Sequence, residues 1–171
     1  MMCKLKVGNA FLRRVIGVVG MGLALISTPA VPAGNDNAAV MAANAAFYAA
    51  LNKIFVGDVG PMKSVWSNAA DVTYMGPTGN FDRGWPAVLK NWEGQAALKL
   101  GGRVEPAEVN MIVGQDIAVL SAYEQGENTN AKGKVERVRL RATNIYRKEG
   151  GQWKMVGHQT DPLPYLIKPN K

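Results

Sequence analysis

The sequence has few of the residues that carry metal, thiol and disulfide chemistry. Among 171 residues it contains one cysteine, Cys3, and one histidine, His158. A single cysteine cannot form a disulfide within the chain, so the fold has to be stabilised by a hydrophobic core. A zinc site usually needs four Cys, His or carboxylate ligands, and no close set of these residues occurs here. We therefore expect no disulfide and no bound metal ion.

Glycine-rich segments are present, but they lack the spacing of a phosphate-binding loop. The two candidates, residues 76–79 and 126–133, match neither the dinucleotide-binding pattern nor the P-loop pattern. Such glycine clusters are typical of turns instead. The sequence thus indicates no nucleotide or other cofactor.

Acidic residues are absent from the first 33 positions, which carry four basic residues. After Arg13 and Arg14 comes an uncharged apolar run, residues 15–27, and then small residues up to Ala33. This order is typical of a secretory signal peptide, residues 1–33, with cleavage after Ala33 or, alternatively, after Ala30. The run is shorter than the roughly 20 apolar residues of a membrane-spanning helix. An uncleaved N-terminal tether is the alternative, and the arginine pair leaves the twin-arginine export route open.

Export would place the mature domain in the periplasm or outside the cell and would remove Cys3 with the signal. Loss of the four basic residues lowers the net charge from +7 to +3. A nucleic-acid-binding domain usually shows a much larger basic excess. We therefore expect no nucleic-acid partner, and no membrane span once the signal has been cleaved.

The remaining chain predicts three helices followed by a series of strands. Apolar residues at helical spacing predict a first helix over 38–56, and prolines at helix starts predict two more over 61–68 and 84–100. Helices followed by consecutive hairpin-linked strands favour an α+β fold, with three N-terminal helices packed on one face of a curved antiparallel sheet. The predicted strands are 71–75, 104–113, 117–125, 134–148 and 153–160, and the prolines of 162–171 predict a C-terminal tail.

Several of these segments, taken in order, resemble the nuclear transport factor 2-like superfamily. The similar strings are YAALN at 48–52 with Gly57-Asp58, VWS at 65–67, DVTY at 71–74 with Gly76-Pro77, Gly84-Trp85, RATNIYRK at 141–148, GQWKM at 151–155, and His158. The resemblance covers residues 38–161 and is closest to exported members of the SnoaL-like or ketosteroid-isomerase-like branch. It implies a cone-shaped domain over residues 34–161 and a deep pocket between the helices and the concave sheet. It also implies a homodimer through the outer sheet face.

The resemblance also identifies catalytic groups that this chain lacks. Isomerases of this branch use an Asp base at the end of the first strand and a Tyr/Asp pair that hydrogen-bonds the substrate oxyanion. At the positions of the two acids this chain has Gly76 and Thr143, and Tyr48 or its neighbour Phe47 falls near the tyrosine. A Tyr48 hydroxyl could polarise a carbonyl group, but no acid is expected opposite it. Steroid isomerisation is therefore not expected.

His158 is the other candidate for acid–base chemistry, together with Tyr48. An imidazole titrates near pH 6.5, so small shifts move it across neutrality. The alternative is a hydrogen-bonded histidine that merely lines the wall. Asp161 lies three residues further on and would point to the opposite face of a strand, so a His–Asp dyad would need a bend near Pro162.

Aromatic and polar residues predict the lining of the pocket, although the same aromatic residues could simply be core. Tyr74 and Trp92 are expected at its mouth, because the first strand and third helix flank the mouth in the family, and Trp66 and Tyr123 are further ligand-binding candidates.

The register of strand 134–148 decides which of two polar residues enters the pocket. Strict alternation places Asn144 inside, whereas the family comparison places Thr143 inside. A β-bulge near Arg141 would reconcile the two, so both remain candidates.

Two functions follow from these features. The first is an exported domain that binds a small apolar or carbonyl-containing molecule, with or without a modest isomerase-, cyclase- or dehydratase-like activity. The alternative is a non-catalytic assembly module, similar in fold to the association domain of calmodulin-dependent kinase, with a cavity filled by its own side chains. Arg137, Arg139 and Arg141 share one strand face and suit either a solvated or a subunit-facing surface.

Overall fold

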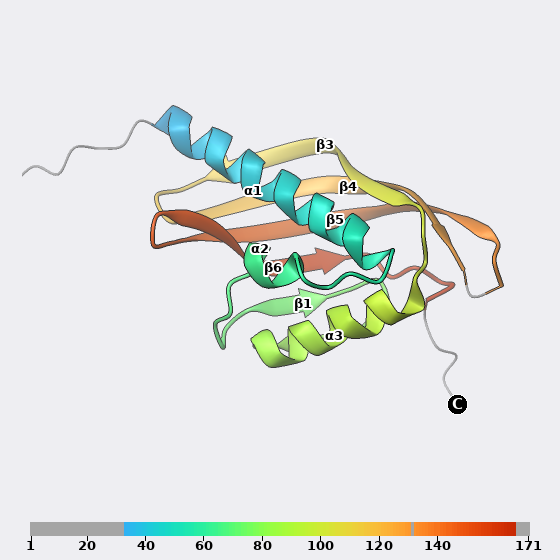
Figure 1. Ribbon diagram of the computed structural model, residues 1–171. Helices are drawn as coiled ribbons and strands as arrows, with labels where there is room; N and C mark the ends of the chain where they lie inside the picture. Colours follow the sequence, from blue (N-terminus) through green and yellow to red (C-terminus); the bar gives the residue numbers. More distant parts are fainter. Residues whose placement is uncertain (1–32, 131, 167–171) are drawn as a thin grey trace, which may run out of the picture. The chain divides into compact units, whose positions relative to one another are not determined.

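The computed structural model describes residues 33–130 and 132–166 (Figure 1). The chain divides into two units, Met1–Ala30 and Val31–Lys171, and the described residues belong to the second. The predicted signal peptide, apart from Ala33, lies outside the described residues, as do residues 167–171 of the predicted tail. Within the described part, no helix is long and apolar enough to cross a membrane.

Helix α1, Ala33–Ile54, forms because one stripe of its surface is apolar and packs on the sheet (Figure 1). It begins earlier than the predicted Ala38. Within it Met41 is 41% exposed, whereas its neighbour Val40 is buried. The fully buried members of the stripe recur at helical spacing: Val40, Asn44, Phe47, Tyr48, Leu51 and Ile54.

Two shorter helices complete the layer beside α1. Helix α2 spans Met62–Val65, and helix α3 spans Trp85–Leu98 with a proline in its first turn. Helix α3 buries Val88, Trp92 and Ala96, which are four residues apart. It ends at Lys99, whose left-handed backbone (φ 45°) donates its N–H to the carbonyl of Ala96.

The described strands form one six-stranded sheet in the order β2-β1-β6-β5-β4-β3. Pairs among β3 to β6 are antiparallel, as predicted, but β1 and β6 run parallel, so the sheet is mixed. No tight turn joins these two strands, and their relative direction is therefore not fixed by a hairpin. The bounds are β1 Thr73–Met75, β2 Asp82–Arg83, β3 Arg103–Val113, β4 Ile117–Thr129, β5 Val135–Glu149 and β6 Gln152–Thr160.

Strand β4 extends further than predicted, to Thr129, into the segment 126–133 that was expected to be a turn, whereas β5 begins at Val135, close to its predicted start. Gly126 lies within β4 with φ 153°, and a Cβ there would overlap the backbone carbonyl of Arg103 on β3. Glycine therefore serves close strand approach at this position and not a turn. The two-residue strand β2 was not predicted, because it is too short to show alternation.

The register of β5 settles which of the two polar residues faces the helices. Pairing with β4 is continuous from Val135 to Arg147, so the bulge near Arg141 that would have reconciled the two placements is absent. Asn144 is 2% exposed on the inner face, and Thr143 lies on the outer face, contrary to the family comparison.

A register shift occurs instead between β5 and β6. Ile145 pairs with Gly157 and Tyr146 with Met155, which leaves Val156 as an extra residue in β6. An extra residue turns the following side chains to the other face. As a result both Met155 and His158 point into the core, although they are three residues apart.

Candidate functional site

The strand register brings Tyr74, His158 and Asn144 into one row across three strands. Tyr74 of β1 pairs with His158 of β6, and His158 pairs with Asn144 of β5. The Tyr74 and His158 rings stack with centroids 5.7 Å apart and planes 9° apart, and His158 Nδ1 lies 2.6 Å from Asn144 Oδ1. Three predicted site residues therefore meet on the inner face of the sheet.

A carboxyl group that was not predicted stands beside this row. Glu124 of β4 is 5% exposed, and its Oε1 lies 3.7 Å from His158 Nε2. That oxygen makes no hydrogen bond within the described residues. Burial raises the pKa of Glu124 to about 7, and the nearby Tyr48 hydroxyl opposes this effect. Burial lowers the pKa of His158 to about 3, so the surroundings favour the neutral form of both groups.

Tyr48 joins the site from α1. Its hydroxyl lies 3.5 Å from Asn144 Nδ2, and burial together with the charge of Glu124 raises its pKa. Phe47, the other candidate for this place, packs edge-on against Tyr48 and lies 4.8 Å from the His158 ring. Both neighbours thus face the site, and Tyr48 supplies the polar group.

The Tyr74 hydroxyl occupies the space in which a side chain at position 76 would stand. A Cβ at Gly76 would overlap the hydroxyl and the ring carbon that bears it. Gln95 of α3 donates a hydrogen bond of 2.7 Å to the Tyr74 oxygen, and burial raises the pKa of Tyr74. Because the oxygen already accepts a bond, the hydroxyl proton is available for another acceptor. The space beside Gly76 is therefore occupied by a phenol.

Around these groups lies a small, partly open cavity of about 30 Å³. Tyr74, Trp92, Glu124 and His158 contribute to its wall, and apolar side chains form most of the remainder. The indole N–H of Trp92, like Glu124 Oε1, makes no hydrogen bond within the described residues. A volume of 30 Å³ corresponds to about one water molecule. The space is thus much smaller than the pocket implied by the resemblance.

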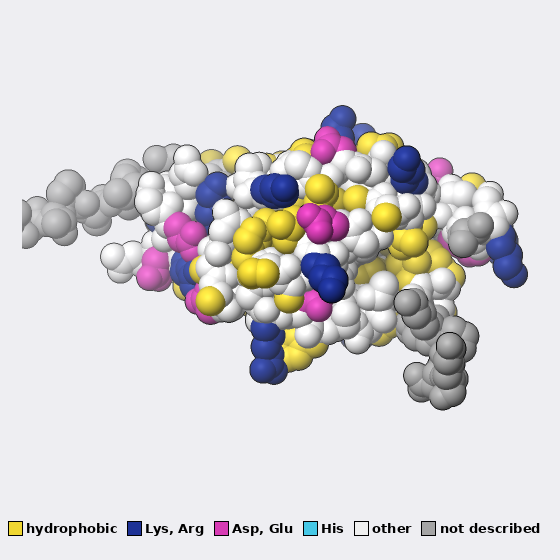
Figure 2. All heavy atoms as spheres, turned by 60° about the horizontal axis from the view of Figure 1, so that its bottom comes forward, with side chains coloured by type: hydrophobic (Ala, Val, Ile, Leu, Met, Phe, Trp, Pro, Cys, Tyr) yellow, Lys and Arg dark blue, Asp and Glu magenta, His cyan; other side chains and the backbone are white. Residues whose placement is uncertain are grey.

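The C-terminal segment closes one side of this cavity. Leu163 is 8% exposed, lines the cavity with Leu166, and donates its backbone N–H to the carbonyl of Pro77 at 2.8 Å. Residues 162–166 therefore do not behave as the expected tail. Figure 2 shows the face that carries α3, with basic, acidic and hydrophobic side chains interspersed and no histidine visible, in line with the 4% exposure of His158.

Other predicted residues lie away from the cavity. Thr143 and Tyr123 are on the outer face of the sheet, where the Arg139 guanidinium covers the Tyr123 ring at 4.2 Å. Asp161 forms an ion pair with Arg141 at 2.8 Å, so it is not the carboxylate partner of His158.

Trp66 is 1% exposed and packs edge-on against Tyr74, with ring centroids 6.4 Å apart. It does not line the cavity and instead supports the Tyr74 ring from behind.

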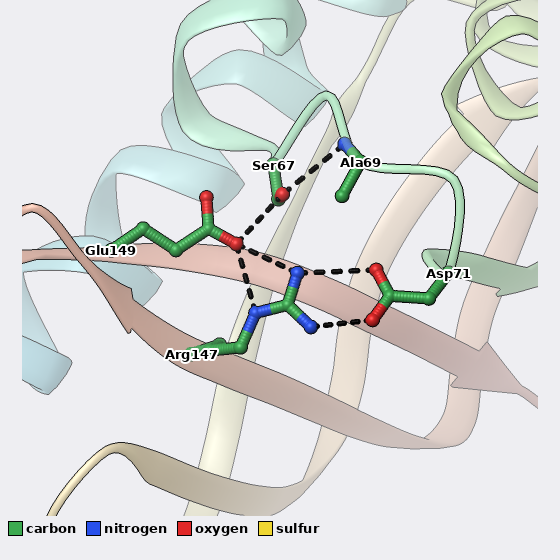
Figure 3. A network of polar contacts seen from close by, with 5 residues as sticks. All are labelled: Ser67, Ala69, Asp71, Arg147 and Glu149. Atoms are coloured by element: carbon green, nitrogen blue, oxygen red, sulfur yellow. Dashed lines mark hydrogen bonds and ion pairs between the residues drawn. The ribbon is translucent and has the colours of Figure 1, made fainter.

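An ion-pair network positions the segment that leads into β1 (Figure 3). Arg147 of β5 contacts both oxygens of Asp71, at 2.6 and 3.1 Å, and also Glu149. Ser67 donates its hydroxyl to Glu149 and its backbone N–H to the carbonyl of Met155. The network thereby fixes the strand that carries Tyr74 beside β6.

Glu124 was missed because the predicted strand ended at Gln125, next to an expected turn where a carboxylate would meet water. Its strand alternates, however, and Ala118, Leu120 and Glu124 share the inner face. An acid in phase with buried apolar residues is the signal that could have identified it. In the described part of the chain, no three potential metal ligands lie together.

Comparison with known families identifies the chain as a member of the SnoaL-like domain family, whose model matches residues 40–162. The chain therefore has the nuclear transport factor 2-like fold, as the sequence resemblance implied. A search of curated proteins gives no significant match.

Solved structures support the same fold. A candidate dehydratase of the NTF2-like family from Streptomyces avermitilis is 23% identical, with a TM-score of 0.67 over 76% of this chain and 98% of that one. A candidate calcium/calmodulin-dependent protein kinase II association domain from Thiobacillus denitrificans is 28% identical, with a TM-score of 0.59 over 72% and 94%. A candidate ketosteroid isomerase from Shewanella frigidimarina is 19% identical, with a TM-score of 0.59 over 72% and 94%.

Proposed function

We propose that the domain binds a small, neutral, mostly apolar molecule that carries a carbonyl or hydroxyl oxygen, and that Glu124 and His158 exchange a proton with it. The observation that carries this proposal is the buried Glu124–His158 pair, 3.7 Å apart, with an unpartnered carboxyl oxygen at an apolar cavity. A buried carboxyl group that merely filled space would be expected to have its oxygens paired. Titratable groups with strongly perturbed pKa values in such a place are typical of functional sites.

The groups around the cavity suit proton transfer next to a carbonyl group. Tyr74 would donate its free proton to the ligand oxygen. The Glu124 carboxylate would take a proton from the adjacent carbon and return it to the same or another carbon, so that no atom is gained or lost. A pKa of about 7 allows both forms of Glu124 near neutrality, which is what a general acid–base group needs. This assigns the proton acceptor to Glu124, because Gly76 cannot fill that role.

Binding requires the cavity to open. Pockets for small molecules usually measure about 300–1,000 Å³, whereas this cavity measures about 30 Å³. The segment Pro162–Leu166 is the part that we expect to move, because it is joined to the cavity rim by one backbone hydrogen bond, Leu163 to Pro77. Displacement of Leu163 and Leu166 would add their volume to the ligand space.

The proposal is tested by hydrogen exchange in heavy water with a small cyclic enone as probe. Wild-type protein should accelerate deuterium uptake at the carbon next to the carbonyl group, as measured by mass spectrometry. The rate with the Glu124→Gln variant should be at least tenfold lower than with wild type. The rate with Glu127→Gln, a change on the outer face of the same strand, should equal that of wild type. Equal rates with wild type and Glu124→Gln would refute the proton-transfer role.

A second candidate is an assembly module without a ligand. The small cavity favours it, since a domain used only for association needs no open pocket. The related structure from Thiobacillus denitrificans is named as an association domain. If this function holds, charge reversal at Arg139, which contacts Glu108 and Tyr123 on the outer face, should lower the oligomer mass in sedimentation velocity. The Lys63→Glu change on α2 is the matched control.

Export and self-association remain part of the proposal. The basic start and apolar run of residues 1–33 support a periplasmic or secreted location. The protein recovered from the exported fraction should have the intact mass of a chain that begins directly after Ala33 or Ala30.

On the outer sheet face, Ile112 pairs with Val119 and Val119 with Ile145, an apolar row that suits a homodimer. A monomer in sedimentation velocity at micromolar concentration would refute the dimer.

A further inference from the structure

A buried chain of hydrogen bonds leads from β5 and α1 to the ring of His158. The Tyr146 hydroxyl donates to Asn44 Oδ1 at 3.0 Å, and Asn144 Nδ2 donates to the same oxygen at 2.9 Å. Asn144 Oδ1 then lies 2.6 Å from His158 Nδ1. None of these four side chains is more than 4% exposed. Because no water competes at such depth, the direction of each bond is set by its neighbours.

The direction of this chain determines where the imidazole carries its proton. Asn144 uses its amide nitrogen on Asn44, so its carbonyl oxygen faces His158. A carbonyl oxygen can only accept, so Nδ1 of His158 must donate. In a neutral imidazole the other nitrogen, Nε2, then has no proton, and its lone pair lies on the side of Glu124.

We propose that Asn144, held in place by Asn44, is a positioning residue that fixes His158 as the Nδ1–H tautomer. This rests on the proposed function, in which Glu124 and His158 form the proton-transferring pair. With Nε2 bare, the resting proton of the pair belongs to Glu124, and the Nε2 lone pair can accept it, which leaves Glu124 as the carboxylate that takes a proton from the ligand. If both amides were turned over, Nε2 would carry the proton and could only donate to Glu124, so it could not take the proton of the carboxyl group.

The surroundings of His158 leave this assignment to Asn144. The Tyr74 ring stacks on one side of the imidazole, and the Phe47 ring packs at 4.8 Å. Neither ring supplies an acceptor to Nδ1. The Tyr48 hydroxyl lies 3.5 Å from Asn144 Nδ2 and can accept a hydrogen bond from it, which is compatible with this orientation of the amide.

The test uses the fact that His158 is the single histidine of the sequence. Full-length chain with 15N-labelled histidine and a purification tag without histidine gives one set of imidazole signals in a long-range 1H–15N correlation spectrum at pH 7. The inference predicts a protonated Nδ1 and an unprotonated Nε2, which is recognised by its couplings to both ring carbon-bound hydrogens. Protonation at Nε2 in the wild type would overturn it.

Variants separate the role of Asn144 from that of the fold. Asn144→Leu should abolish the fixed tautomer, whereas Thr143→Val, on the outer face of the same strand, should retain it. An unchanged tautomer in folded Asn144→Leu would overturn the role of Asn144. Should the leucine variant fail to fold, Asn144→Asp decides, because an aspartate still accepts from Nδ1 and should retain the tautomer. An unprotonated Nδ1 in that variant counts against the inference.

The tautomer is measured without a ligand, so its outcome is independent of the proposed activity. Nε2–H in the wild type together with exchange activity lost in Glu124→Gln leaves the proposed function standing and removes this inference. Nδ1–H together with equal exchange rates for wild type and Glu124→Gln removes the proposed function and leaves the tautomer assignment standing.

Discussion

The replacement of Glu124 by glutamine should stabilise the protein at alkaline pH, which is unusual for a change in a core. Burial raises the pKa of Glu124 from its ordinary value of 4.5 to about 7, so the folded state holds the proton more tightly than the unfolded state. Below pH 4.5 Glu124 is protonated in both the folded and the unfolded state, so its burial costs no stability through ionisation. Between pH 4.5 and 7 only the unfolded chain releases its proton, so stability falls as the pH rises, and above pH 7 the loss levels off.

The difference between the two pKa values corresponds to about 3 kcal/mol. That is a large fraction of the roughly 5–15 kcal/mol by which a domain is stable. Glutamine has nearly the same shape and does not titrate, so the stability of Glu124→Gln relative to wild type should rise by about 3 kcal/mol between pH 4 and pH 8. His158 is present in both proteins, so its contribution to the pH dependence of stability largely cancels when the two are compared at the same pH.

Urea unfolding at a series of pH values measures this difference. With m-values of about 1–3 kcal/mol/M, the midpoint of the variant should move above that of wild type by about 1–3 M at pH 8, relative to pH 4. Glu127→Gln, an exposed residue of the same strand, should follow wild type at every pH. A stability difference that does not change with pH would refute the burial argument for Glu124.

Three further changes test the packing around the site. Gly76→Ala should destabilise the fold by about 1–3 kcal/mol and displace the Tyr74 ring, seen as a changed tyrosine signal by NMR, because a Cβ there overlaps the phenol; an unchanged signal at full stability would contradict this. Leu163→Ala should lower the free energy of unfolding by about 2 kcal/mol and increase binding of a hydrophobic dye, whereas no change would mean that the C-terminal segment is a tail after all. Arg147→Met should lower the melting temperature by a few degrees, and more than Arg137→Met on the same strand, since Arg147 contacts Asp71 and Glu149; equal effects of the two changes would show that the network does not stabilise β1.

Much of the fold was predictable, because its helices and strands have clear periodicity. The apolar stripe of residues 40–54 and the alternation of Val138, Leu140 and Ala142 identify a helix and a strand without help from tertiary structure. The parallel pairing of β1 with β6 was not predictable from such patterns, because it depends on contacts between segments far apart in the sequence.

The candidate site was predictable only in part. Tyr74, Trp92, Asn144 and His158 were identified as candidates, and the structure places them around one cavity or in the row beside it. Their arrangement depends on the extra residue at Val156, and no local signal in the sequence reveals a β-bulge at that point.

The placement of Thr143 and Tyr123 in the pocket followed from a family register and from aromatic character, respectively. Both side chains lie on the outer face because β4 and β5 alternate without interruption. Simple alternation along each strand places both residues correctly, because every second side chain of a strand lies on the same face and Tyr123 and Thr143 fall in the outward-facing set.

We propose that the interior of the domain binds a small molecule through Glu124, and native mass spectrometry can detect such a molecule without knowledge of its identity. Wild-type protein, Glu124→Gln and Glu127→Gln would be produced from the full-length chain in its natural host and recovered from the exported fraction. We expect one reproducible additional small mass on wild type and Glu127→Gln, and its loss from Glu124→Gln. A clean ligand-free protein in all three cases, unchanged after exposure to host extract, would contradict the claim and favour the assembly module.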